Sequence, residues 1–266
     1  MEIKFDKFEE QIFLNTVLIE NLTDNESGTG FVISKPAEEG KQKLLLFSNK
    51  HVFWGKKDKD AKDIKKTIRL TFHKIKEDDT YELGQVHSFV VEIDRTEGKV
   101  YFDHTNPKVD VGCINISSLN NRGIKLNIPA LDINEFAKFD RSELIAGMKI
   151  LFVGYPSAFY DKKNSLPVMR SGTIASIPSV DFNGEPCILL DAQVFPGSSG
   201  SPVFAIVKDK YQLLGIISSG VCKGLDFVEI EKSSDEKNTK TSVPVEWLGL
   251  GLLFINETIK EIYDLV

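Results

Sequence analysis

Short β-rich runs separated by turn signals fill most of this chain, and they constrain its fold more than any other feature. The clearest runs are IFLNTVLIE, GTGFVIS, KLLLFS, TIRLTFHKI, SFVVEID, KILFVGYP, CILLDAQV, SPVFAIV, YQLLGIISSG and GLGLLFI. Many short strands without helical periods between them are typical of a sandwich or barrel. The segment INETIKEIYDLV instead shows helical spacing of its apolar residues. We therefore expect an all-β fold that ends in an α-helix.

Size and charge limit the class of protein. The chain has 266 residues, of which 41% are hydrophobic, enough to fill the core of one large all-β unit or two small ones. Its 39 acidic and 33 basic side chains are mixed along the sequence. Because charge is not gathered into blocks, we expect neither a nucleic-acid partner nor a membrane partner.

Two further features point to the cytoplasm. The amino terminus MEIKFDKFEEQIF lacks the basic start, apolar middle and small-residue cleavage site of a signal peptide. Cys113, Cys187 and Cys222 are odd in number and far apart, without the paired spacing of a metal site. We expect three reduced, buried thiols, a cytoplasmic protein, and no metal or organic cofactor.

The segment PGSSGSP, residues 196–202, is the strongest local signal for chemistry. It lies between the apolar runs CILLDAQVF and VFAIV, so it predicts a tight turn between two strands. Such a turn can expose the hydroxyl of Ser199 as a nucleophile. It also leaves the backbone N–H groups of Gly197 and Ser199 free to form an oxyanion hole. A plain β-turn rich in Gly, Ser and Pro is the alternative.

A serine hydroxyl becomes a good nucleophile only when a base takes its proton, and the chain has four histidines. His51 lies where the apolar run KLLLFS ends and the chain turns, which favours it as the general base. His73 lies within an alternating strand, His87 at a strand start and His104 in a polar loop.

The base needs a carboxylate that accepts its second N–H. Asp110 precedes an apolar strand and stands between Val109 and Val111, so we expect it to be partly buried and paired. Asp103, in the loop beside His104, is the competitor.

The order His51, Asp110, Ser199 resembles the trypsin/chymotrypsin-like serine protease family, in particular its intracellular, disulfide-free bacterial and HtrA-type branches. GTGFVIS is similar to the strand beside the histidine, and LLDAQVFPGSSGSP is similar to the run around the serine. The resemblance implies two antiparallel β-barrels of the six-stranded type in one protease unit. Residues 1–125 would carry His51 and Asp110, and residues 126–266 would carry Ser199 and end in the helix.

The same resemblance implies a substrate site. GIISSG is similar to the strand that binds the substrate backbone, which would give Ser218, Ser219 and Gly220 this role. Gln193, six residues before Ser199, would stand at the base of the primary pocket. The acid expected there in trypsin-like enzymes is missing, so cleavage after Lys or Arg is not supported.

The expected activity is hydrolysis of a peptide or protein substrate through an acyl-enzyme, and control by a regulatory protein partner is a further hypothesis. Two other enzyme classes fit less well: an α/β-hydrolase elbow needs G-x-S-x-G, and a cysteine nucleophile needs Cys at position 199. The alternative from another class is a catalytically silent protease-like module that serves as a binding or scaffold protein.

Overall fold

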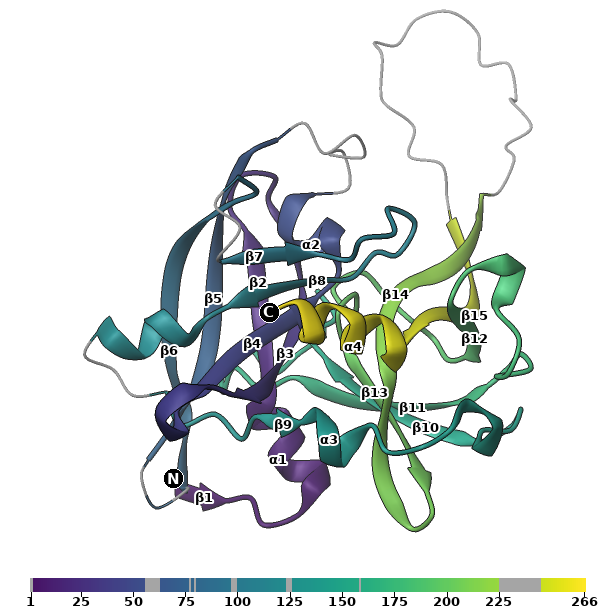
Figure 1. Ribbon diagram of the computed structural model, residues 1–266, viewed down its shortest axis with the longest axis horizontal. Coiled ribbons are helices and arrows are strands. Elements are labelled where there is room, and N and C mark those ends of the chain that lie inside the picture. The colour runs from purple at the N-terminus through teal and green to yellow at the C-terminus, as the bar shows by residue number, and fades with distance from the viewer. Residues whose placement is uncertain are drawn as a thin grey trace, which may run out of the picture.

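Two β-sheets lie side by side and make up most of the molecule (Figure 1). The computed structural model describes residues 2–55, 63–76, 78, 80–96, 100–122, 126–157, 159–224 and 245–266. Within them, one sheet is a closed six-stranded barrel and the other is a longer curved sheet. The expected all-β class with a C-terminal helix is confirmed.

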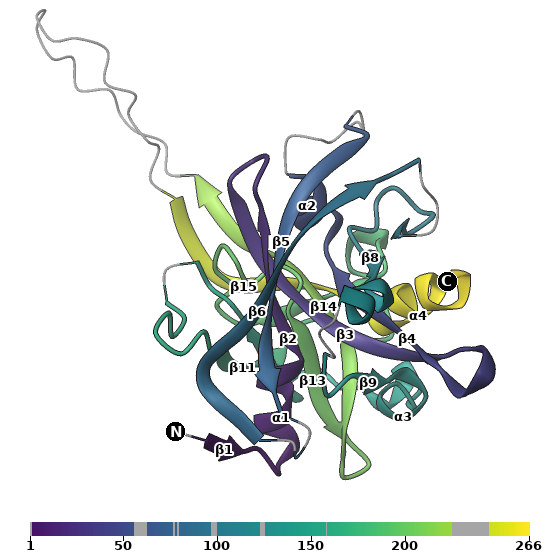
Figure 2. The ribbon, with the colours of Figure 1, turned by 90° about the vertical axis from the view of Figure 1, so that its left-hand side faces the viewer.

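The first sheet takes up the amino-terminal part of the chain. Its described strands are β1 (Glu2–Lys4), β2 (Thr16–Asn21), β3 (Glu26–Pro36), β4 (Gln42–Ser48), β5 (Lys65–Ile75), β6 (Thr80–Asp94), β7 (Tyr101–Asp103), β8 (Gly112–Asn115) and β9 (Leu131–Asp132). They follow the order β1-β6-β5-β2-β3-β4-β8-β7, and β9 adds in parallel to β3. The β5–β6 ribbon faces the viewer in Figure 2.

The second sheet is the barrel. Its strands are β10 (Lys149–Gly154), β11 (Val168–Ile174), β12 (Cys187–Asp191), β13 (Pro202–Val207), β14 (Lys210–Gly224) and β15 (Val245–Ile255). Closure follows the order β10-β11-β12-β15-β14-β13, and all pairs are antiparallel. Interior side chains such as Ile188, Leu190 and Leu253 are fully buried, so the barrel is a packed core.

Helices are short and sit where the sheets meet or turn. They are α1 (Phe8–Asn15), α2 (Lys50–Trp54), α3 (Ile133–Phe136) and α4 (Asn256–Leu265), and no helix of the described residues is long and apolar enough to cross a membrane. Helix α4 leaves the barrel and lies over the first sheet (Figure 1). Ile259 and Ile262 of α4 pack in a core that draws on both sheets.

Helix α1 was not expected, because IFLNTVLIE reads as a single strand. The strand begins only at Thr16, whose hydroxyl donates to the carbonyl of Ile12 at 2.7 Å. The buried Asn15 side chain donates to the carbonyls of Val32 and Pro129. These long-range contacts stabilise a helix end that local spacing does not indicate.

The described cysteine side chains agree with the expectation of reduced thiols. Cys113 and Cys187 are buried and free, while the side chain of Cys222 lies outside the described residues. Burial raises the pKa of both described thiols, which keeps them protonated. They act as small apolar groups of the core.

His73 is buried in β5, between two tyrosine hydroxyls. Its Nδ1 lies 3.3 Å from the Tyr81 hydroxyl and its Nε2 lies 3.1 Å from the Tyr155 hydroxyl. Desolvation lowers the pKa of His73 to about 4. The ring is therefore neutral at pH 7 and belongs to the interior of the molecule.

This burial predicts a loss of stability in mild acid. Between pH 6.5 and 4 the unfolded chain binds a proton at His73 and the folded protein does not, so the free energy of unfolding falls as pH falls. From pH 7 to pH 5 we expect His73 alone to lower the free energy of unfolding by about 2 kcal/mol. Chemical denaturation of the wild type and of His73→Phe at both pH values measures the effect. Equal pH dependence in the two proteins would contradict it.

Candidate active site

His51 and Asp110 are hydrogen-bonded to each other at the edge of the first sheet. His51 lies in α2, directly after β4, and its Nδ1 is 2.5 Å from Asp110 Oδ2. The backbone N–H of His51 also donates to Asp110 Oδ1 at 3.1 Å. Both carboxylate oxygens thus bond to His51, one to its imidazole and one to its backbone N–H, which leaves the Nε2 side of the ring for another partner.

The loop that carries Asp110 is held by its apolar neighbours and by α2. Val109 and Val111 are fully buried, and Asp110 between them is 27% exposed at its side chain. Asn49 donates to the Asp110 carbonyl at 2.7 Å, and Lys50 Nζ donates to the His104 carbonyl at 3.0 Å. Burial lowers the pKa of Lys50. Asn49 and Lys50, at the junction of β4 and α2, therefore hold the main chain of the loop that carries the carboxylate.

Ser199 lies in the turn between β12 and β13. Gly197 and Gly200 both have φ of +89°, a conformation that disfavours other residues. A Cβ at Gly200 would stand 1.8 Å from the Thr29 carbonyl oxygen, so only glycine fits there. The turn is tight because its glycines allow this conformation and this approach.

The backbone N–H groups of this turn fall into two sets. Ser198 donates to Phe195 O, Gly200 to Ile217 O and Ser201 to Ser198 O. Gly197 and Ser199 form no such bond within the described part of the chain. Two unengaged donors therefore flank the Ser199 hydroxyl, which is the arrangement that an oxyanion hole requires.

Ser218 connects Asp110 with Ser199. Its hydroxyl lies 3.4 Å from Asp110 Oδ2, and its carbonyl accepts the Ser199 hydroxyl at 2.9 Å. The ladder between β14 and β15 shifts register between Ile217 and Ser219, so Ser218 stands in a bulge. The Ser199 proton points to this carbonyl, and no hydrogen bond joins Ser199 to His51 among the described residues.

Thr29 of β3 joins the first sheet to the Ser199 turn. Its backbone N–H donates to Ser199 O at 2.8 Å, and its hydroxyl donates to Gly197 O at 2.8 Å. The same hydroxyl accepts the N–H of Tyr155 at 2.9 Å. Thr29 is fully buried, so these bonds lie in the seam between the two sheets.

The loop after β10 holds the other side of the turn. The Ser157 N–H donates to the Pro196 carbonyl at 2.9 Å. Because N–H and C=O point in opposite directions across a trans peptide, this bond directs the Gly197 N–H away from Ser157. A Cβ at Gly197 would meet Tyr155 O at 2.3 Å, which shows how closely the loop lies against the turn.

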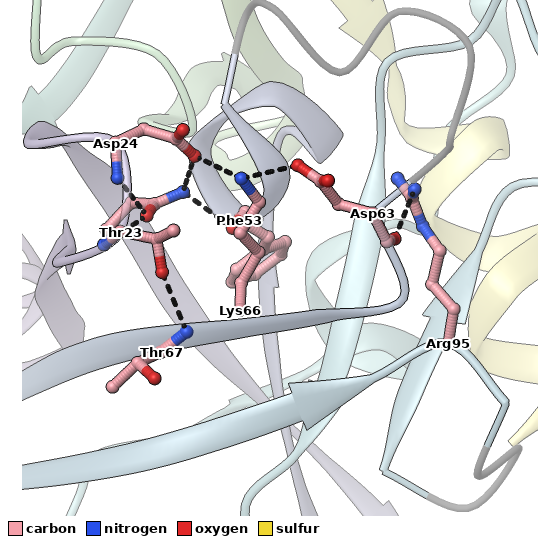
Figure 3. A network of polar contacts seen from close by, with 8 residues as sticks. Thr23, Asp24, Phe53, Asp63, Lys66, Thr67 and Arg95 are labelled. Carbon is pink, nitrogen blue, oxygen red and sulfur yellow. Dashed lines mark hydrogen bonds and ion pairs between the residues drawn. The ribbon is translucent and has the colours of Figure 1, made fainter.

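A polar network supports the far end of α2 (Figure 3). Asn21 donates both to the Phe53 carbonyl and to Asp24, each at 3.0 Å. Lys66 is 4% exposed at its side chain and lies 2.7 Å from the carboxylates of both Asp24 and Asp63. The two carboxylates raise the pKa of Lys66 despite its burial. This network connects β2, β5 and the helix that carries His51.

Arg95 completes the support of α2. Its guanidinium lies 3.9 Å from the centre of the Trp54 ring and donates to the Asp63 carbonyl (Figure 3). Neither Lys66 nor Arg95 stands out in the sequence, because each lies among other charged residues. The GTG of GTGFVIS could have indicated the Thr29 seam, since two glycines beside a buried strand residue signal close approach.

The remaining candidates lie away from this cluster or at its edge. His104 faces Glu261 of α4 at 2.9 Å, His87 lies within β6, and Asp103 accepts the Tyr101 hydroxyl. Gln193 and Ser219 are exposed, and Gly220 is partly buried. Ser219 and Gly220 lie in β14 just beyond the bulge at Ser218.

The fold and the site define a protein with the architecture of chymotrypsin-like serine proteases. Residues 28–216, well over half of the chain, match the family described as trypsin-like peptidase domain. The chain therefore belongs to this family, which confirms the resemblance seen in the sequence. No curated protein matches the chain significantly.

Many solved structures resemble the fold. Human heparin binding protein aligns at a TM-score of 0.53 and 10% identity, over 96% of this chain and 92% of that one. An atomic-resolution structure of HBP aligns at 0.52 and 9% identity, with the same coverage. At such identity the likeness shows the fold alone. The first of these proteins is named for binding heparin. The fold by itself therefore does not decide between a catalytic and a binding function.

Proposed function

We propose that the protein is a serine endopeptidase that hydrolyses peptide bonds through an acyl-enzyme on Ser199. The observation that carries the proposal is the double hydrogen bond of Asp110 to His51, which fixes the imidazole with Nε2 available as a base. The unengaged N–H groups of Gly197 and Ser199 support it.

The proposed mechanism is acyl transfer in two stages. His51 takes the Ser199 proton as the oxygen attacks the scissile carbonyl, and Asp110 stabilises the imidazolium that forms. The N–H groups of Gly197 and Ser199 hold the oxyanion, and His51 then protonates the leaving amine. Water repeats these steps on the acyl-enzyme. The residues need no metal or organic cofactor for this chemistry.

We propose that the substrate binds as an added strand on β14. The β13 ladder starts at Pro202, opposite Ile216, so Ser218, Ser219 and Gly220 have β15 on one side and no described strand on the other. An extended peptide can pair with this edge. Gln193 would then lie at the base of the primary pocket, as its position before Ser199 implies.

The Ser199 hydroxyl suggests how the activity is controlled. Its bond to Ser218 O must be exchanged for one to His51 before attack. A regulatory protein partner that favours this rotation of the Ser199 hydroxyl would control the activity. We also propose a cytoplasmic location, which the free, buried thiols of Cys113 and Cys187 support. The same bond favours the second candidate function, a silent scaffold module in which Ser199 never turns to His51.

Labelling with a fluorophosphonate probe separates the two functions. We expect the wild type to form an adduct on Ser199, located by mass spectrometry, and Ser199→Ala to form none, because only an activated serine attacks the probe. Ser198→Ala, which changes the neighbouring serine, is the matched control and should still be labelled. A folded wild type that forms no adduct and leaves a peptide library intact would favour the scaffold.

The bond between Ser157 and Pro196 predicts a second result. Ser157→Pro removes the N–H that holds the Pro196 carbonyl, so this peptide can turn and place its oxygen in the oxyanion hole. Loss of one oxyanion donor costs about 3 kcal/mol, so we expect kcat to fall by roughly a hundredfold or more. Ser157→Ala keeps the N–H and should retain wild-type kcat.

Steady-state hydrolysis of a peptide substrate measures both variants, and melting temperatures identify those that are folded. A folded Ser157→Pro protein with the kcat of Ser157→Ala would contradict this role of the bond.

A further inference from the structure

Arg170 lies at the end of the barrel next to the segment that leads to Ser199. It belongs to β11 and is paired directly with Phe152 of β10, so both side chains point to the same side of the sheet. Phe152 is buried in the barrel core. The Arg170 guanidinium lies 4.7 Å from the centre of the Phe195 ring and 5.7 Å from that of Phe152.

This guanidinium has no anionic partner within the described residues. Its Nη1 atom is buried without a hydrogen bond, and no ion pair involves Arg170. The other described arginine side chains each have a carboxylate within 4.0 Å: Arg69 has Glu20, Arg95 has Asp103 and Arg141 has Asp181. A guanidinium that is partly withdrawn from water and unpaired is unfavourable unless a ligand supplies the anion.

The position of Arg170 indicates which ligand this is. Phe195 is four residues before Ser199, and its carbonyl accepts the Ser198 N–H at the start of the turn. The segment Gln193–Pro196 is the one that forms the primary pocket if the proposed substrate orientation is right. Gln193 is exposed and uncharged, and the exposed Asp191 forms no ion pair with Arg170. The described residues thus place a cation against the segment that leads to Ser199 and leave it unneutralised.

We propose that Arg170 receives the carboxylate of an aspartate or glutamate side chain on the residue whose carbonyl Ser199 attacks. The inference rests on the proposed peptidase function and adds the class of substrate. A guanidinium matches a carboxylate with two parallel hydrogen bonds, and partial burial strengthens the pair. The two phenylalanine rings hold the guanidinium plane and exclude water from one side of it.

The test compares peptides that differ only in Glu or Gln at the cleaved position, with blocked termini. We expect the wild type to have a kcat/KM at least tenfold higher for Glu than for Gln. In Arg170→Met this ratio should fall to about one, and Arg170→Lys should keep an intermediate ratio because the charge remains without the paired geometry. Arg69→Met removes an arginine of β5 in the first sheet that is already paired with Glu20, and it should keep the wild-type ratio.

The outcomes separate this inference from the proposed function. A wild type that fails to form a fluorophosphonate adduct defeats the peptidase proposal itself. A labelled wild type that cleaves Glu and Gln peptides equally, or that prefers Glu as strongly after Arg170→Met, overturns the role of Arg170. If Arg170→Met does not fold, the Arg170→Lys variant still tests the role of Arg170, because its ratio of kcat/KM for Glu over Gln peptides should fall below that of the wild type.

Discussion

The hydrogen bonds of Thr29 are the constraint on which the site depends. One buried residue of the first sheet donates to the carbonyls of Ser199 and Gly197 and also accepts the N–H of Tyr155, which directly follows β10 of the second sheet. Its own carbonyl accepts the Ser48 hydroxyl at 2.6 Å, next to the helix that carries His51. The Ser199 turn and the His51 helix are therefore positioned by the same residue, although they are almost 150 positions apart in sequence.

Close backbone approach makes this seam possible. A Cβ at Gly28 would stand 2.6 Å from Val52, the neighbour of His51, and 3.2 Å from Ser199 O. A Cβ at Gly200 would overlap the Thr29 carbonyl. Larger residues at these positions would push the two sheets apart. The Ser199 turn and the His51 helix would then also move apart. The Asn21 and Lys66 network then fixes the opposite end of α2, so the His51 helix is held at both ends.

The sequence was informative where the chemistry depends on local patterns. Strand alternation and the glycine-flanked serine indicated the all-β fold and the Ser199 turn, and Asp110 between two valines indicated a half-buried acid. The links between these segments were not visible, because they are long-range contacts of ordinary residues. Ser218 illustrates this: its sequence suggested main-chain binding of substrate, while in the structure it also joins Asp110 to Ser199. Helix α1 was missed for a similar reason, since contacts of Asn15 with distant carbonyls stabilise its end.

The proposed role of Asp110 is to make His51 the base for Ser199, and Asp110→Asn tests this role most directly. The substitution keeps the size of the side chain but removes the charge that stabilises the imidazolium and favours the wrong tautomer of His51. The rate of peptide hydrolysis at pH 7, measured against the wild type, should fall by about 10⁴, the effect known for this change in a trypsin-like triad. A folded Asp110→Asn protein that hydrolyses the peptide at the wild-type rate would contradict the account.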